Sequence, residues 1–206
     1  MKTKIIPFDS DHAIETAISI LADGGLIAFP TDTVYGVACD LWNSEAIEKV
    51  FTAKGRSKDK PLPILVGEKE QLSQITELSQ INPNTITLLK HFWPGAMTVI
   101  MPKQASIPEN LSPFDTIGVR MPNHSRLLEL LKKTGPLAVT SANLSGQDNP
   151  TTAEEVLTQL GGRIDLILDG GKTRSGIPST VISSTPDGFN ILRQGAITED
   201  QIKALF

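Results

Sequence analysis

Short apolar runs alternate with segments of helical periodicity along the whole chain, and this alternation constrains the fold more than any other feature. Ala13, Ile14, Ala17 and Leu21 recur at three- and four-residue spacing, which places them on one face of a helix. Residues 26–29 then form an uninterrupted apolar run that is typical of a buried strand. Strands and helices intermixed in this way predict an α/β or mixed α+β fold.

The same patterns predict the remaining elements. Further helices are expected over residues 44–53, 69–76, 84–92, 123–133, 152–160 and 197–206. Further strands are expected over residues 63–66, 97–101, 117–120, 137–140 and 166–168, with a late hairpin over residues 181–183 and 190–192 that turns at Pro186-Asp187-Gly188. The first helix is expected to be capped by Ser10 or Asp11. No internal repeat or long linker divides the chain, so we expect one domain over residues 1–206 with its core at about 10–195.

The composition favours a protein that folds without covalent or metal crosslinks. A domain of 206 residues, 39% of them hydrophobic, can bury roughly 70% of the surface that its unfolded chain exposes. Cys39 is the one cysteine, so no internal disulfide can form and a reducing cytoplasm is the expected compartment. We expect no membrane association, because no apolar stretch approaches the ~20 residues of a membrane span. The net charge of -4 argues against a general nucleic-acid coat protein but is compatible with a local basic cleft.

The first of four chemically unusual loops is residues 30–36, PTDTVYG, directly after the strand predicted at residues 26–29. Hydroxyls, a carboxylate and a phenol gather at the end of a strand, where α/β folds commonly place ligands. The same composition also fits an ordinary polar turn whose Thr and Asp side chains bond their own backbone. Composition alone leaves both interpretations open.

The second loop, residues 54–61, KGRSKDKP, holds four basic groups and one acid at the end of a predicted helix. A solvated charge run, with Lys54 near a helix C-terminus, is the alternative interpretation. Gly55 lets the backbone break and Pro61 leads directly into an apolar strand, so we expect the loop to be held against the fold. Arg56 would offer a planar fork for phosphate or carboxylate.

The third and fourth loops each include the end of a predicted strand. Residues 116–122, TIGVRMP, contain Arg120, which could bond loop carbonyls or clamp a carboxylate. Residues 139–146, VTSANLSG, lead into small hydroxyl and amide residues of the kind that cap helices or line a tight anion pocket. Smaller polar groups follow at Ser179-Thr180 and Arg193.

Several familiar catalytic devices are absent from the sequence. It has neither a G-x-x-x-x-G-K-[ST] phosphate loop nor a G-x-G-x-x-G motif, and it has no G-x-S-x-G nucleophile elbow. His12, His91 and His124 lie far apart and near no cysteine, so metal-ligand spacing is missing. What remains is a polar, partly basic site suited to positioning charged substrates.

In their order along the chain, these loops resemble the YrdC/TsaC family of threonylcarbamoyl-AMP synthases. The resemblance spans about residues 13–193 and rests on PTDTVYG at 30–36, KGR at 54–56, GVRMP at 118–122, SANLSG at 141–146, PSTV at 178–181 and RQG at 193–195. It implies a twisted, mostly parallel central sheet flanked by helices, with a deep positive cleft. It also implies a nucleotidyltransferase that converts L-threonine, bicarbonate and ATP into threonylcarbamoyl-AMP and pyrophosphate. A downstream transferase would then modify an adenosine beside the tRNA anticodon.

The resemblance also implies roles for individual residues. The expected L-threonine contacts, with Arg120 on the α-carboxylate, are Thr33, Arg120, Ser141 and Ser179. The expected ATP contacts are Arg56, Lys60, Thr116, Asn143, Thr151 and Arg193. Lys54 and Arg56 are the expected catalytic residues, because positive charge must offset the repulsion between two reacting anions. Mg²⁺ would bind through the phosphates of ATP and not through protein side chains.

The chain departs from the family pattern at Leu65, where some members have a histidine near threonine, and at Ser57, where a proline often follows the arginine. It ends at Phe206, so the resemblance predicts the short form without a second domain, with residues 171–175 as a candidate to help close the cleft. A non-catalytic RNA-binding module of the same fold is the alternative, although the acidic charge and few aromatic residues argue against it. A carbamoyl-adenylate-forming domain like that of hydrogenase maturation proteins is a further alternative. Direct contact with tRNA stays open.

Overall fold

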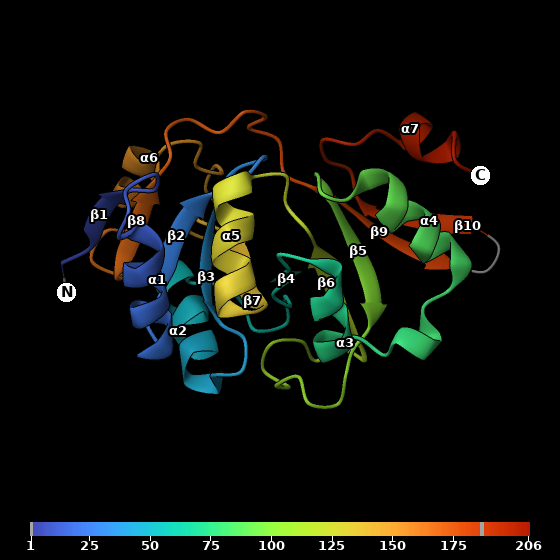
Figure 1. Ribbon diagram of the computed structural model, residues 1–206, viewed down its shortest axis with the longest axis horizontal. Coiled ribbons are helices and arrows are strands. Elements are labelled where there is room, and N and C mark those ends of the chain that lie inside the picture. Colours follow the sequence, from blue (N-terminus) through green and yellow to red (C-terminus); the bar gives the residue numbers. More distant parts are fainter. Residues whose placement is uncertain (1, 186–187) are drawn as a thin grey trace.

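A computed structural model describes residues 2–185 and 188–206 (Figure 1). The helices are α1 Ala13–Ala22, α2 Ser44–Lys54, α3 Leu72–Ile75, α4 Pro83–Phe92, α5 Ser125–Thr134, α6 Ala153–Leu160 and α7 Glu199–Lys203, with 3-10 turns η1 Lys69–Gln71 and η2 Leu78–Gln80. The strands are β1 Lys4–Pro7, β2 Ile27–Pro30, β3 Tyr35–Asp40, β4 Ile64–Leu65, β5 Met97–Pro102, β6 Thr116–Arg120, β7 Leu137–Ser141, β8 Leu166–Asp169, β9 Thr180–Thr185 and β10 Gly188–Arg193.

The strands of the described residues hydrogen-bond into one sheet, in the order β1-β8-β2-β3-β7-β4-β6-β5-β9-β10. Between these described strands, four pairings are parallel and five are antiparallel. The α/β class is confirmed, but the sheet is mixed and not mostly parallel as the resemblance implies. One cause of the antiparallel pairing is the short connection between β2 and β3. Residues 31–34 are too few for the crossover that parallel strands need, so β2 and β3 form a hairpin.

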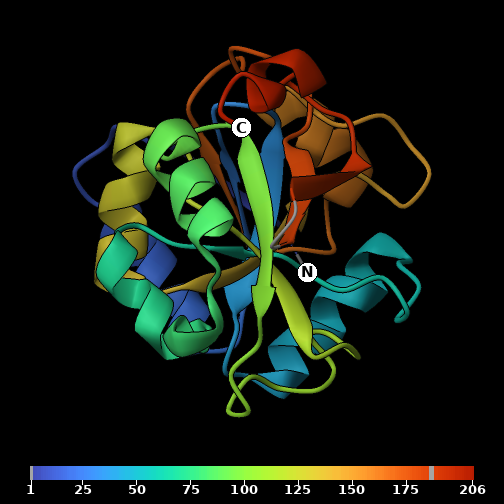
Figure 2. The same ribbon diagram turned by 90° about the vertical axis from the view of Figure 1, so that its right-hand side faces the viewer.

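Helices cover both faces of the sheet, which Figure 2 shows edge-on. Alternate residues of β2 point to opposite faces. Ile27 and Phe29 pack in the apolar cluster that contains residues of α1 and α5, and Ala28 packs in the cluster that contains residues of α2 and α6. The two-residue period of a strand thus explains why β2 is buried along its whole length between two helical layers.

Strand β3 lies in the middle of the sheet and is not predicted by the sequence patterns, which assign Tyr35 and Gly36 to a polar loop. Glycine is needed here because a Cβ atom at position 36 would lie 2.9 Å from Cγ1 of Val139 on β7. Glycine within a strand often marks such a close approach and weakens the strand pattern in the sequence. The polar loop therefore ends at residue 34, and Tyr35 and Gly36 are the first residues of the buried strand β3.

Most other predicted elements are confirmed with boundaries shifted by a few residues. The expected cap of α1 is wrong, because His12 precedes the helix and no side chain of Ser10 or Asp11 caps it. Strand β1 is additional, and residues 197–206 shorten to helix α7. The predicted turn residues Pro186 and Asp187 lie outside the described residues. Within the described parts of the chain, no helix is long and apolar enough to cross a membrane.

Ile47 tests the packing that holds helix α2 on the sheet. The residue is 0% exposed, so Ile47→Ala removes apolar contacts and leaves a cavity. We expect the free energy of unfolding, measured by denaturant titration, to fall by about 2–5 kcal/mol. Ile86→Ala on α4 is the matched control, since this residue is 44% exposed, and it should change the same quantity by less than about 0.5 kcal/mol. Equal losses in the two variants would contradict the packing described for α2.

Candidate active site

A cavity of about 290 Å³ opens where the β2–β3 turn meets the ends of β4, β6 and β7. Six of the residues predicted from the sequence line it together: Thr33, Arg56, Arg120, Ser141, Ser179 and Arg193. Leu65, Pro63 and Val139 add an apolar wall, and no carboxylate of the described residues lines the cavity. The cavity therefore combines guanidinium and hydroxyl groups with a small apolar surface.

Arg120 is buried at the end of β6, and its guanidinium is held by three acceptors. Nε donates to the carbonyl oxygen of Gly95 at 2.9 Å, and Nη1 donates to Thr33 Oγ1 at 2.9 Å. Nη2 forms an ion pair of 2.5 Å with Oδ1 of Asp32. A guanidinium has five N–H donors, so two have no acceptor among the described residues. Two N–H groups on neighbouring nitrogens can bind one carboxylate.

The hydrogen bonds of the β2–β3 turn decide which way the Thr33 hydroxyl points its proton. Thr31 Oγ1 donates to the carbonyl oxygen of Val34 at 2.8 Å, so its one proton is used. In the 2.8 Å contact between the two hydroxyls, Thr33 must therefore be the donor. Thr33 Oγ1 also accepts from Arg120, which leaves one lone pair. Thr33 can thus accept a hydrogen bond from a ligand amine or hydroxyl but cannot donate one.

Arg56 and Arg193 place two further guanidinium groups at the cavity. Arg56 donates from Nε to the carbonyl oxygen of Lys60 at 3.1 Å and from Nη2 to that of Pro61 at 3.0 Å, so its guanidinium closes the basic loop on itself. Arg193 donates from Nη2 to the carbonyl oxygen of Ser179 at 2.8 Å. Burial and the nearby charge of Arg193 both lower the pKa of Arg56. An anion bound between these two cations would relieve their repulsion.

Lys54 lies behind the Ser141–Asn143 turn and not at the cavity surface. Its buried Nζ donates to the carbonyl oxygens of Ser141 and Asn143, the latter at 2.5 Å, and contacts Oδ1 of Asn143 at 3.4 Å. Ser141 Oγ donates to the same Oδ1, and Asn143 Nδ2 donates to backbone carbonyls of Leu144 and Gln147 at 2.8 Å. In this arrangement Lys54 and Asn143 support the turn that presents Ser141.

Four predicted ATP contacts lie outside the lining of the cavity, and one of them is Asn143 in the turn described above. Lys60 is exposed on the basic loop. Thr116 begins β6, at the opposite end of that strand from Arg120, and is exposed. Thr151 donates its hydroxyl to Oε2 of Glu155 at 3.1 Å. The contacts of these four residues with ATP stay predictions, as does the direct catalytic role of Lys54.

The structure also reveals residues that the sequence did not single out. Asp32 supplies the ion pair to Arg120, and Thr98 on β5 shares a 2.8 Å hydrogen bond with Ser179. Asp32 was visible as a carboxylate in the PTDTVYG loop, but its partner is 88 residues away in sequence. Among the described residues, no three His, Cys, Asp or Glu side chains gather as a metal site would require. Mg²⁺ bound through phosphates stays a prediction.

Comparison with known proteins identifies the family. The Sua5/YciO/YrdC family, described as telomere recombination, matches residues 19–195. The chain belongs to the Sua5/YciO/YrdC family. This result confirms the predicted resemblance over nearly the same residues.

Relatives within the Sua5/YciO/YrdC family share most of this chain. A Bacillus subtilis protein named threonylcarbamoyl-AMP synthase is 42% identical in an alignment of 202 residues, which covers 95% of this chain and 57% of that protein. The structure of Pyrococcus abyssi Sua5 complexed with L-threonine matches with a TM-score of 0.91 and 36% identity, over 99% of this chain and 60% of that one. E. coli YciO matches with a TM-score of 0.83 and 25% identity, over 98% of both chains. This chain thus spans less than two thirds of the first two proteins.

Lys54 makes stability depend on pH. Burial, and secondarily the charge of Arg56, lower its pKa from 10.5 to about 7. Between about pH 7 and pH 10 the unfolded chain therefore binds a proton that the folded chain does not, so the free energy of unfolding should rise with pH. Lys54→Met, which cannot titrate, is the reference, and urea titrations of both proteins across this window give the difference. A difference that does not change with pH would show that the three oxygen acceptors keep the ammonium charged.

Proposed function

We propose that this chain is a threonylcarbamoyl-AMP synthase, which converts L-threonine, bicarbonate and ATP into threonylcarbamoyl-AMP and pyrophosphate. The observation that carries the proposal is Arg120, which lines a small cavity with Arg56 and Arg193 and keeps two N–H groups without an acceptor among the described residues. The name of the B. subtilis relative and the L-threonine complexed with P. abyssi Sua5 support the same substrates.

The cavity suits an amino acid bound in one orientation. The α-carboxylate of threonine would bind the free N–H groups of Arg120, and an amine or hydroxyl proton would be donated to Thr33. Ser141 and Ser179 line the same cavity and offer further hydroxyls, while Leu65 and Val139 can contact the threonine methyl group. At Leu65 the contact would be one of shape alone, because its side chain has no hydrogen-bonding group.

The chemistry proceeds in two steps. The threonine amine, after losing a proton, attacks the carbon of bicarbonate or of carbon dioxide derived from it, and the oxygen lost from bicarbonate leaves as water. The resulting carbamate oxygen attacks the α-phosphorus of ATP, the bond from that phosphorus to the β-phosphate oxygen breaks, and pyrophosphate leaves. No general base is evident, so catalysis would depend on positioning and on charge.

Arg56 and Arg193 would offset the repulsion between carbamate and phosphate. At ~4 Å and an effective dielectric constant of ~20, each cation could contribute roughly 4 kcal/mol before desolvation costs. Other parts of ATP are proposed to contact Lys60, Thr116, Asn143 and Thr151. Mg²⁺ would neutralise part of the negative charge of the phosphates. Lys54 would affect the reacting anions chiefly by supporting the Ser141–Asn143 turn.

The cellular setting is part of the proposal. Cys39 is buried and free, which fits a reducing cytoplasm. The product would pass to a downstream threonylcarbamoyl transferase that modifies tRNA, and direct tRNA contact is left to experiment. A non-catalytic RNA-binding module remains the second candidate, but the exposed aromatic residues Trp42, Phe114 and Phe206 belong to three separate segments of the chain. Stacking platforms for single strands need such residues along one groove.

Pyrophosphate release tests the proposed function. With ATP, bicarbonate and Mg²⁺ present, we expect pyrophosphate to form only when L-threonine is added, with threonylcarbamoyl-AMP detected by mass spectrometry. Release that does not need threonine would favour a different carbamoyl-adenylate chemistry. No release under conditions where ATP binds would refute the synthase assignment.

Arg56→Ala should reduce kcat by roughly 100-fold or more, because a cation that faces the developing charge is lost. The loss of its two backbone hydrogen bonds should lower the free energy of unfolding by only about 1–3 kcal/mol. Arg163→Ala is the control, since this arginine lies outside the cavity and donates to Ala53 at 3.3 Å. Parallel loss of turnover and of folded protein would instead indicate a structural role for Arg56.

A further inference from the structure

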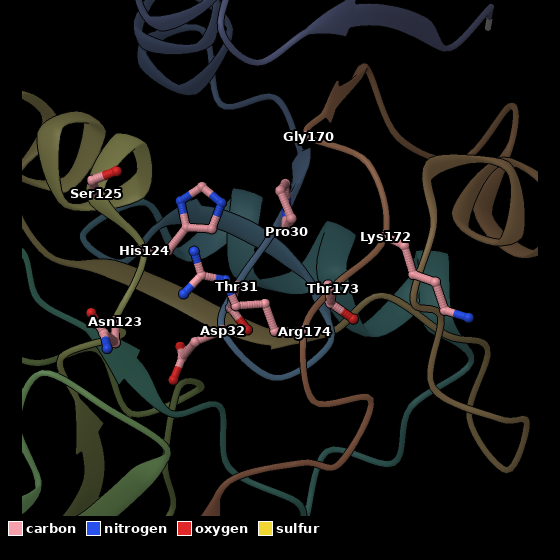
Figure 3. Close-up of a pocket in the computed structure, with 10 residues that line it drawn as sticks. All are labelled: Pro30, Thr31, Asp32, Asn123, His124, Ser125, Gly170, Lys172, Thr173 and Arg174. Carbon is pink, nitrogen blue, oxygen red and sulfur yellow. The ribbon is translucent and has the colours of Figure 1, made fainter.

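A second cavity, of about 320 Å³, lies beside the first and shares Thr31 with it. Figure 3 shows the side chains that line it, which come from the end of β2, the start of α5 and the loop after β8. None of the roles proposed above for threonine or ATP uses this cavity. Its lining differs from that of the first cavity because a helix N-terminus forms one side.

The start of helix α5 borders the cavity with hydrogen-bond donors. His124 caps the helix, and its Nδ1 accepts the N–H of Leu127 at 3.3 Å. Burial lowers the pKa of His124, so at neutral pH the ring carries its one proton on Nε2. The backbone N–H groups of Ser125 and Arg126 have no acceptor among the described residues. Such free N–H groups and the helix dipole attract an anion.

The loop after β8 adds a cation and a buried hydroxyl. Arg174 has no hydrogen bond or ion pair among the described residues. Figure 3 shows its guanidinium next to the ring of His124, and its charge helps to lower the pKa of that ring. Thr173 lines the cavity and is 8% exposed, and its Oγ1 is buried without a partner in the described structure. An unpaired buried hydroxyl opposes folding unless a ligand or water satisfies it.

Hydrogen bonds hold this loop in place. The hydroxyl of Tyr35 donates to the carbonyl oxygen of Gly171 at 2.8 Å. The N–H of Thr173 donates to the carbonyl oxygen of Thr151 at 2.9 Å, and that of Gly176 to Thr33 at 2.9 Å. The loop that carries Arg174 is therefore anchored on both sides of that residue. Because the backbone on both sides of Arg174 is already fixed, binding a ligand there needs less ordering of the loop.

The charges around the cavity favour an anion. Its one carboxylate among the described lining residues is Asp32, whose charge is engaged by Arg120 at 2.5 Å. Lys172 and Arg174 are the cations among the described lining residues, and neither forms an ion pair with a described residue. We propose that this cavity binds a small oxyanion of the phosphate class, held by Arg174, Ser125 and the N-terminus of α5. Since the two cavities share Thr31, the pyrophosphate of the proposed reaction is one source of this anion and free inorganic phosphate is the other.

Amide NMR titrations without ATP or threonine test the site independently of the proposed function. We expect inorganic phosphate, and separately pyrophosphate, to shift the amide signals of Ser125 and Arg126 saturably. Arg174→Gln should weaken this binding by roughly tenfold, the loss expected for a charge-assisted hydrogen bond. Ser125→Pro should also weaken it, because proline is tolerated at the first helical position but lacks the N–H group.

Lys90→Gln is the matched control for charge, since Lys90 lies on α4, outside the lining of this cavity, and it should leave the Kd unchanged. Tighter binding of pyrophosphate than of phosphate would identify the reaction product as the ligand, and equal binding would identify free phosphate. Shifts confined to the surroundings of Arg56 and Arg193 would overturn the proposal. So would shifts of Ser125 and Arg126 that persist with the same Kd in Arg174→Gln.

Discussion

The buried guanidinium of Arg120 is the interaction on which the candidate site depends. It sits at the end of β6 and takes its acceptors from the β2–β3 turn and from Gly95 before β5, so one side chain joins three segments of the sheet. A buried charge is tolerated only where it is paired and its donors are satisfied. Asp32 supplies the paired charge, and two N–H groups stay without an acceptor among the described residues on a side chain that lines the cavity. The same contacts that make burial possible thus define where a carboxylate can bind.

Lys54 and Arg56 show how neighbouring basic residues can reach different surroundings. Lys54 ends helix α2 and is buried, whereas Gly55 takes a left-handed conformation with φ of 60° and turns the chain away. Arg56 therefore emerges on the cavity side and Lys54 stays behind the Ser141–Asn143 turn. Both were reasonable anion contacts from the sequence, because the KGR spacing gives no direction for either side chain. The backbone turn at Gly55 decides between direct contact and support.

Much of the fold and part of the candidate site could be predicted because their signals are local. Apolar periodicity located most helices and strands, and the order of the polar loops indicated the family. Strand β3 was missed because Gly36, which β7 requires, weakens the strand pattern. Asp32, Thr98 and the true surroundings of Lys54 could not be found, because each depends on a partner brought close only by the folded sheet. Parallel and antiparallel pairing likewise depends on connections across the whole chain.

Three guanidinium groups share one small cavity, and their mutual repulsion shapes what the site can do. Burial lowers the pKa of both Arg56 and Arg120, and the charge of Arg193 adds to the lowering. Asp32 compensates Arg120 alone, so the charges of Arg56 and Arg193 are offset by no carboxylate among the described residues that line the cavity. These two cations therefore repel one another, and an anionic ligand relieves that repulsion. The repulsion between Arg56 and Arg193 is reduced further as more negative charge is bound between them. The two arginines therefore favour the binding of carbamate and triphosphate together over either one alone.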